Sequence, residues 1–161
     1  MGVTTVSDLG PEQQEALRRA EEALERSYNP YSHFAVGACL LMTGGEWIAG
    51  ANVENAAYGP TICAERSAVV RANAEGLRTF QGIAVIGGGK GVKSEPGAKV
   101  TGPCGVCRQV LYELAEVGEN DPWVVLSSPD KSAIEVTTVR ALLPYGFGPT
   151  NLGLDVTPWK R

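Results

Sequence analysis

Three cysteines and one glutamate carry the clearest chemical signal in this sequence. Cys104 and Cys107 are three positions apart, so at the start of a helix both sulfurs can face one point. Cys63 opens a second predicted helix and can supply a third sulfur. A helix N-terminus favours thiolate over thiol, because its unpaired N–H groups stabilise negative charge. Three protein ligands leave a tetrahedral Zn²⁺ with one open position, which is the arrangement of a catalytic zinc site.

Glu65 is the candidate proton carrier beside such an ion. It lies two residues after Cys63, and side chains at i and i+2 diverge on a helix, so Glu65 is badly placed to bind the same metal. It can instead exchange protons with the water that the metal activates. Arg66 and Arg108 directly follow the two cysteine motifs. We expect both to donate hydrogen bonds to the sulfurs and to balance their negative charge.

The cysteine pattern also has simpler interpretations. A C-x-x-C pair alone is typical of structural zinc knuckles and of redox motifs, and a structural zinc module would have a closed site and no role for Glu65. The combination of C-x-E at residues 63–65 with P-C-x-x-C at residues 103–107 is more specific, because it nearly matches the signature of zinc deaminases. The fourth cysteine, Cys39, lies inside an apolar run, where we expect a small buried residue.

The composition is that of an ordinary globular enzyme. The chain has 161 residues, of which 43% are hydrophobic and 20% charged, and we expect one domain over residues 1–161 with its core at about 11–152. The net charge of −4 and the lack of a basic run argue against a nucleic-acid partner. No apolar run approaches the ~20 residues of a membrane span, and the first residues do not resemble a secretion signal. We therefore expect a cytoplasmic protein that does not bind membranes.

The order of predicted elements indicates an α/β fold with a mixed sheet covered by helices. Helices are expected where apolar residues recur at helical spacing, over Pro11–Ser27, Cys63–Gly76 and Cys104–Glu116. Strands are expected at short apolar runs, over Phe34–Met42, Trp47–Asn52, Ile83–Ile86, Trp123–Leu126 and Ile134–Thr137. We expect a surface loop over Gly87–Gly102 and an irregular apolar tail from Leu142.

Four motifs in one order make the chain similar to the cytidine deaminases, specifically the small homotetrameric type that acts on free nucleosides. They are PYSHFAVGA at Pro30–Ala38, NVENAAYGPTICAERSA at Asn52–Ala68, PCGVCRQVL at Pro103–Leu111 and LLPYGFGP at Leu142–Pro149. The likeness runs from about Ala20 to about Leu152. It implies a three-layer α/β/α fold, one Zn²⁺ per chain held by the three cysteines, and a homotetramer.

The resemblance also implies roles for residues that bind the nucleoside. Phe34 would pack against it, and Asn52 and Glu54 would bond the ribose hydroxyls. The backbone of Ala64, together with Glu65, would read the pyrimidine edge. Without the resemblance, Asn52 and Glu54 have a simpler interpretation as turn residues.

Two aromatic residues would act across a subunit boundary if the resemblance holds. Tyr58 and Phe147 would reach the active site of a neighbouring subunit, with Phe147 near the base. The simpler interpretation of Phe147 is an apolar residue packed in an apolar tail.

The reaction that this resemblance implies is hydrolytic deamination of cytidine and 2′-deoxycytidine to uridine and 2′-deoxyuridine, with release of ammonia. An alternative is a deaminase of a modified aminonucleoside such as blasticidin S, which the intact NVEN segment argues against. A cytosine editor of polynucleotides is a further alternative, which the acidic charge and the compact length disfavour.

Overall fold

The computed structural model of the protein describes residues 4–89 and 99–160. Their centre is a five-stranded sheet with the strand order β2-β1-β3-β4-β5. The strands are β1 (Phe34–Met42), β2 (Trp47–Ala51), β3 (Phe80–Gly89), β4 (Trp123–Ser127) and β5 (Ile134–Thr138). The helices that cover the sheet are α1 (Pro11–Leu24), α2 (Ala64–Ala74) and α3 (Gly105–Gly118), with a short α4 at Val139–Leu142. Three 3₁₀ turns complete the chain, at η1 (Val6–Asp8), η2 (Pro149–Leu152) and η3 (Thr157–Trp159).

The sheet is mixed, as the sequence predicts. Strand β1 pairs antiparallel with β2 on one side and with β3 on the other. Strands β3 and β4 run parallel, and α3 forms the crossover that a parallel connection requires. The edge strand β5 then pairs antiparallel with β4.

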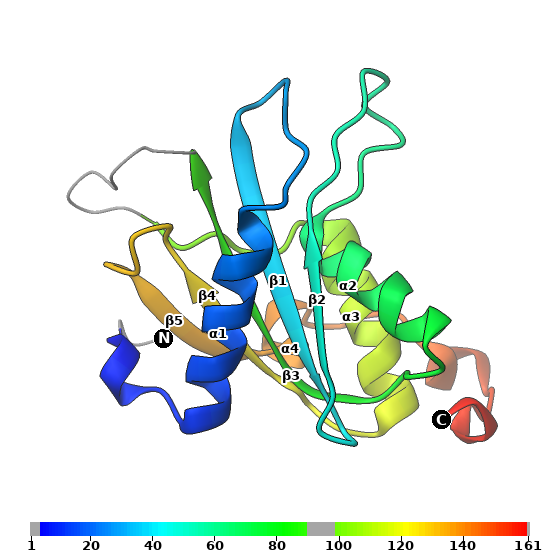
Figure 1. Cartoon of the computed structure of the whole chain (residues 1–161). Coiled ribbons are helices and arrows are strands. Elements are labelled where there is room, and N and C mark those ends of the chain that lie inside the picture. The colour runs from blue at the N-terminus through cyan, green and yellow to red at the C-terminus, as the bar shows by residue number, and fades with distance from the viewer. Residues whose placement is uncertain (1–3, 90–98, 161) are drawn as a thin grey trace.

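Helices cover both faces of the sheet, which confirms the three-layer α/β/α prediction (Figure 1). On one face α1 packs through Leu17 and Ala20 against the sheet. On the other face α2 and α3 contribute Ala68 and Leu111 to a second core. Strand β1 is buried on both faces, which explains why its sequence is a continuous apolar run rather than an alternating one. No helix among the described residues has the length and apolar character to span a bilayer.

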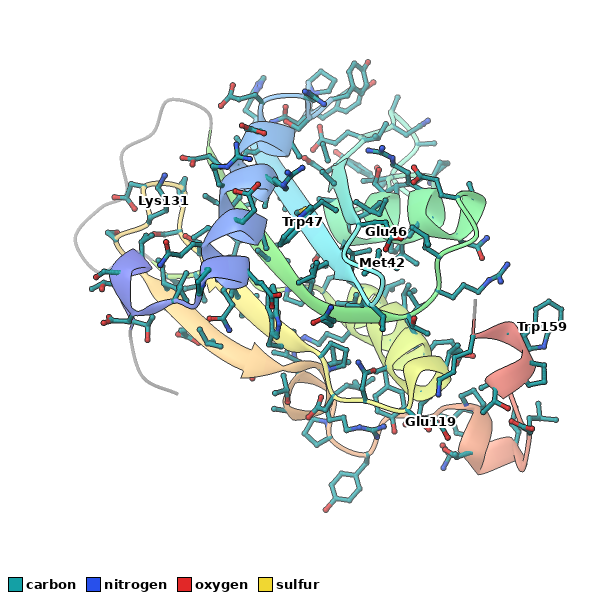
Figure 2. The ribbon with its side chains drawn as sticks, turned by 60° about the horizontal axis from the view of Figure 1, so that its bottom comes forward. Met42, Glu46, Trp47, Glu119, Lys131 and Trp159 are labelled. Atoms are coloured by element: carbon teal, nitrogen blue, oxygen red, sulfur yellow. The ribbon has the colours of Figure 1, made fainter. Side chains whose placement is uncertain are left out.

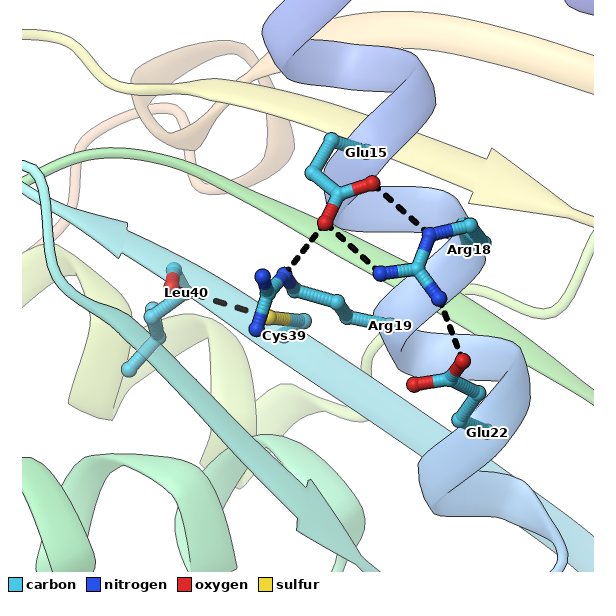
Figure 3. A network of polar contacts seen from close by, with 6 residues as sticks. All are labelled: Glu15, Arg18, Arg19, Glu22, Cys39 and Leu40. Carbon is cyan, nitrogen blue, oxygen red and sulfur yellow. Dashed lines mark hydrogen bonds and ion pairs between the residues drawn. The ribbon is translucent and has the colours of Figure 1, made fainter.

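Helix α1 ends at Leu24, three residues before the predicted end at Ser27. Its outward face carries an ionic network in which Glu15 accepts hydrogen bonds from Arg18 and Arg19, both at 2.7 Å (Figure 3). Cys39 lies on the α1 face of the sheet, fully buried, as the sequence predicts (Figure 3). Burial raises the pKa of its thiol to about 12, so Cys39 is an uncharged packing residue.

Gly50 determines how closely α2 approaches the sheet. A Cβ atom at this position of β2 would lie 2.4 Å from the Ala68 nitrogen and 2.6 Å from the Ala64 carbonyl oxygen. Real Cβ contacts do not come this close, so the first turns of α2 rest directly on the backbone of β2. The helix that begins beside Cys63 is thereby fixed against a rigid strand.

Both predicted ends of the strand expected at Ile83–Ile86 were wrong. Strand β3 begins earlier, at Phe80, and extends to Gly89, into the segment predicted to be a loop, because Gly87, Gly88 and Gly89 pair through their backbones with residues 34–36 of β1. Because Gly88 has no side chain, Pro129 can pack against its backbone: a Cβ at Gly88 would lie 2.4 Å from the Pro129 ring. Most of the remaining predicted loop, residues 90–98, lies outside the described residues.

The tail is more regular than predicted. Helix α4 follows β5 directly, and the Thr138 hydroxyl caps it by accepting a hydrogen bond from the Ala141 N–H. The last turn, η3, lies near the end of α3, where the Lys160 ammonium pairs with the Glu119 carboxylate. Figure 2 shows Trp159 on this turn and Glu119 at the end of α3.

Candidate active site

The N-termini of α2 and α3 meet at one place in the molecule, and the cysteines lie there. Cys63 is the N-cap of α2 and Cys104 is the N-cap of α3. Cys107 is in the first turn of α3. Each N-terminus offers unpaired N–H groups and the positive end of a helix dipole. The structure thus confirms the predicted placement of both cysteine motifs at helix starts.

The three sulfurs form a cage of the right size for zinc. The Sγ atoms of Cys63 and Cys104 are 3.9 Å apart, and those of Cys104 and Cys107 are 3.6 Å apart. All three lie within 4.8 Å of one another. A tetrahedral zinc ion with Zn–S bonds of ~2.3 Å places its sulfur ligands about 3.8 Å apart. Cys107 is buried and Cys104 is exposed, so the cage is closed by protein on one side and open on the other.

The electrostatics of the cage favour a thiolate before any metal arrives. Hydrogen bonding from Cys107 lowers the pKa of Cys63 to about 6, with help from Cys104 and from the positive charge of Arg66. The same hydrogen bond raises the pKa of Cys107, and burial raises it further. Cys63 therefore takes the negative charge of the cage more readily than Cys107, which would release a proton on binding a cation.

Glu65 lies beside the cage as the second residue of α2, with only 4% of its surface exposed. Burial raises the pKa of its carboxyl group, and the negative charge of Cys63 raises it further. A carboxyl group whose pKa is raised and that lies beside a candidate metal site is a candidate for accepting and donating protons there. Ala64, which precedes it, is fully buried at the first position of α2.

The two arginines differ in what they contact. Arg66 is close enough to Cys63 for its charge to lower the pKa of that thiol. Arg108 instead donates to two backbone carbonyls, from Nε to Pro103 at 2.8 Å and from Nη1 to Leu142 at 3.1 Å. Neither bond goes to a sulfur, so in this structure Arg108 braces the backbone beside Cys104.

The comparison with known protein families agrees with this site. The cytidine and deoxycytidylate deaminase zinc-binding region matches residues 11–119 of the chain, which include all three cysteines and Glu65. The chain belongs to this family.

Individual cytidine deaminases match most of the chain. The cytidine deaminase of Halalkalibacterium halodurans is 43% identical over 136 residues, 84% of this chain and 94% of the relative. That of Sporosarcina psychrophila is 40% identical over 136 residues, 84% of this chain and 91% of the relative. The crystal structure of cytidine deaminase from Burkholderia pseudomallei superposes with a TM-score of 0.72 at 38% identity, covering 86% of this chain and all of that one. The fold and the zinc-binding character of this deaminase family member are thereby established.

Asn52 has a structural task in this deaminase that the sequence did not reveal. Its buried side chain bridges the start of β1: Oδ1 accepts from the Val36 N–H at 2.8 Å, and Nδ2 donates to the Phe34 carbonyl at 3.0 Å. The amide therefore fixes the backbone from which the Phe34 side chain projects.

Glu54 acts similarly on the preceding turn. Its carboxylate accepts from the N–H groups of Tyr31 at 2.9 Å and Ser32 at 3.2 Å, and from the Ser32 hydroxyl. These hydrogen bonds, that of the hydroxyl first, lower the pKa of Glu54. Asn52 thus joins the segment after β2 to the start of β1, and Glu54 joins it to the turn before β1. Phe34 contacts Asn52 through its carbonyl, and its N–H donates to the Ser32 hydroxyl at 3.0 Å.

The two aromatic residues that were expected to act between subunits are exposed in the single chain, Tyr58 at 83% and Phe147 at 59%. Phe34, which was expected to pack against the nucleoside, is 43% exposed. Tyr145, two residues before Phe147 in the same motif, is fully exposed. Its positive φ of 58° is a local backbone feature that residue type alone does not predict.

Proposed function

We propose that this deaminase converts cytidine and 2′-deoxycytidine to uridine and 2′-deoxyuridine by zinc-dependent hydrolysis, with release of ammonia. The observation that carries the proposal is the pairing of the zinc-sized cysteine cage with the buried carboxyl group of Glu65 at the start of α2. The named relatives, which are cytidine deaminases, support cytidine as the substrate. They do not favour the alternative of a modified aminonucleoside such as blasticidin S.

The zinc ion would be held by Cys63, Cys104 and Cys107, one ion per chain. When bound, zinc supplies a Lewis acid that activates a water molecule as the nucleophile at C4. Glu65 accepts the proton that this water loses and delivers it to N3 of the ring. Glu65 then moves the second proton of the water to the departing amine, which leaves as ammonia. Burial raises the pKa of this carboxyl group, which favours its holding a proton between these transfers.

The nucleoside would be held by residues at the start of β1 and just after the end of β2. Phe34 would pack against it, and Asn52 and Glu54 would bond the ribose through the acceptor and donor capacity that their backbone contacts leave free. The backbone of Ala64 would read the pyrimidine edge. Remote contacts of this kind supply binding energy that free cytosine lacks.

The exposed aromatic residues support a homotetramer in which neighbouring subunits complete each site. Tyr58 and Phe147 are large apolar side chains in solvent, and such exposure is common where a partner covers the surface. Phe147 would lie near the base in the neighbour's site. We further propose a single deaminase domain, a cytoplasmic location and a role in pyrimidine salvage, which fit a nucleoside substrate and an acidic chain.

A panel of cytosine compounds tests this proposal directly. Deamination changes the ultraviolet absorbance of the base, and we expect this change with cytidine and 2′-deoxycytidine. Free cytosine, cytidine monophosphate and blasticidin S should give a far smaller change. Equal turnover of cytosine and cytidine would contradict the ribose contacts. Turnover of blasticidin S alone would replace the proposed substrate by the alternative.

A further inference from the structure

One face of α3 holds the loop that carries Phe147. The Arg108 guanidinium donates to the Leu142 carbonyl at 3.1 Å, where the loop begins. The Gln109 side chain donates from Nε2 to the carbonyl of Phe147 itself at 2.7 Å. The loop is therefore anchored at the residue whose ring projects into solvent.

The far end of the loop is anchored by Glu116. This carboxylate, only 7% exposed, accepts a hydrogen bond from the Thr150 hydroxyl at 2.6 Å and pairs with Arg140 at 2.6 Å. The Arg140 guanidinium in turn lies 5.6 Å from the centre of the Tyr112 ring. The segment before the loop, through Arg140, and the segment after it, through Thr150, are thus both held by the Glu116 carboxylate.

The middle of the loop lies flat on Tyr112. A Cβ at Gly146 would be 2.7 Å from the ring of Tyr112, and one at Gly148 would be 3.0 Å from it. The two glycines that flank Phe147 therefore let its backbone touch α3, while the Phe147 ring remains 59% exposed. A fixed backbone that presents an exposed aromatic ring is the arrangement of a binding anchor.

The anchors also connect this loop to the cysteine cage. Arg108, Tyr112 and Glu116 follow Cys104 at four-residue intervals, so all four lie in one row along α3. A single helix therefore carries two cage cysteines at its start and the Phe147 loop along its side.

We propose that Gln109 and Glu116, which touch no reacting atom, are positioning residues that set where the Phe147 ring is held relative to the nucleoside. The inference rests on the proposed role of Phe147 in cytidine binding. Loss of either anchor loosens the loop at Phe147, so part of the order of the ring must be restored each time a nucleoside binds. Binding weakens, while the cage and the proton transfers of Glu65 are unaffected.

A double-mutant cycle on the zinc-loaded enzyme tests the proposal. We expect Gln109→Ala to raise KM for cytidine roughly five- to tenfold, the effect of one lost hydrogen bond, with kcat within about twofold and zinc content unchanged. In a Phe147→Ala background, Gln109→Ala should have no further effect on KM, because the ring that it positions is gone. If Gln109 only stabilised the fold, Gln109→Ala would change KM by the same factor whether or not Phe147 is present.

A second variant and a control complete the test. Thr150→Val removes the hydroxyl that bonds Glu116 but keeps the side-chain shape, and it should show the same dependence on Phe147. Gln14→Ala is the matched control, because Gln14 donates from Nε2 to the Leu9 carbonyl at the same 2.7 Å, on the opposite face of the sheet. Its KM should stay at the wild-type value.

Three outcomes would overturn the inference. The first is that Gln109→Ala and Thr150→Val each change KM by the same factor with and without Phe147. The second is a KM change in Gln14→Ala as large as in Gln109→Ala. The third is an unchanged KM in Phe147→Ala. Failure of the proposed function is distinguishable, because the wild-type enzyme would then not deaminate cytidine at all. If Gln109→Ala does not fold, the cycle with Thr150→Val decides.

Discussion

Replacing Gly50 with Ala tests whether the contact between β2 and α2 positions the catalytic residues. The new Cβ would lie 2.4 Å from the Ala68 nitrogen, whereas an unstrained contact needs about 3.5 Å, so α2 must move by roughly 1 Å. Overpacking of this kind costs about 1–3 kcal/mol of the free energy of unfolding. For a chain of this size each kcal/mol lowers Tm by about 2–4 °C. The displaced helix carries Cys63 at its cap and Glu65 in its first turn.

The functional effect should exceed the loss of stability. A catalytic group misplaced by ~1 Å can cost about a hundredfold in rate, so we expect kcat of Gly50→Ala to fall about a hundredfold in protein that circular dichroism shows to be folded. Gly37→Ala is the control on the other face of the sheet, where its Cβ would lie 1.9 Å from the Ala20 carbonyl oxygen of α1, an even closer contact. It should lower Tm but leave kcat of the folded protein within a few-fold of wild type. Equal loss of kcat in both variants, or an unchanged kcat in Gly50→Ala, would refute the reasoning.

Three further predictions concern the metal, the pH dependence of stability and the sharing of sites. Inductively coupled plasma emission spectroscopy should find about one zinc per chain in the wild type and in Cys39→Ala. It should find almost none when Cys63, Cys104 or Cys107 is replaced by Ala, because each is a proposed ligand. The Thr150 hydroxyl, as the first cause, lowers the pKa of Glu116 in the folded protein. The ionised carboxylate therefore stabilises the fold above its unfolded pKa of ~4.5, and this stabilisation is lost as the pH falls. Glu116→Gln should lower Tm at pH 7 and make Tm fall less steeply between about pH 5 and 3. Mixing Glu65→Gln with Phe147→Ala under conditions of subunit exchange should restore part of the activity, and no recovery despite proven exchange would confine each site to one chain.

The chemistry of the cage could be predicted from the sequence because it depends on local structure. Cys104 and Cys107 are neighbours on one turn of helix, and a helix start stabilises thiolates wherever it occurs. The burial that raises the pKa of Glu65 also follows from its place in the first turn of a helix packed on the sheet.

Contacts between distant segments could not be predicted in the same way. The hydrogen bond from Gln109 to Phe147 joins residues 38 positions apart, and that from Thr150 to Glu116 joins residues 34 apart. A glutamine or glutamate on a helix is ordinarily a solvated residue, so nothing in its type reveals such a partner. The extension of β3 was missed for a related reason, since Gly87–Gly89 pair by backbone alone and glycine is depleted in strands generally.

The measurement that tests the central claim most directly is the activity and zinc content of Glu65→Gln. Gln keeps the shape of the side chain but cannot accept a proton, and one group serves every proton transfer of the proposed reaction. We expect about one zinc per chain, a Tm near that of the wild type and a kcat for cytidine lowered by several orders of magnitude. A zinc-loaded Glu65→Gln enzyme with kcat within tenfold of the wild type would contradict the assignment of Glu65 as the proton carrier.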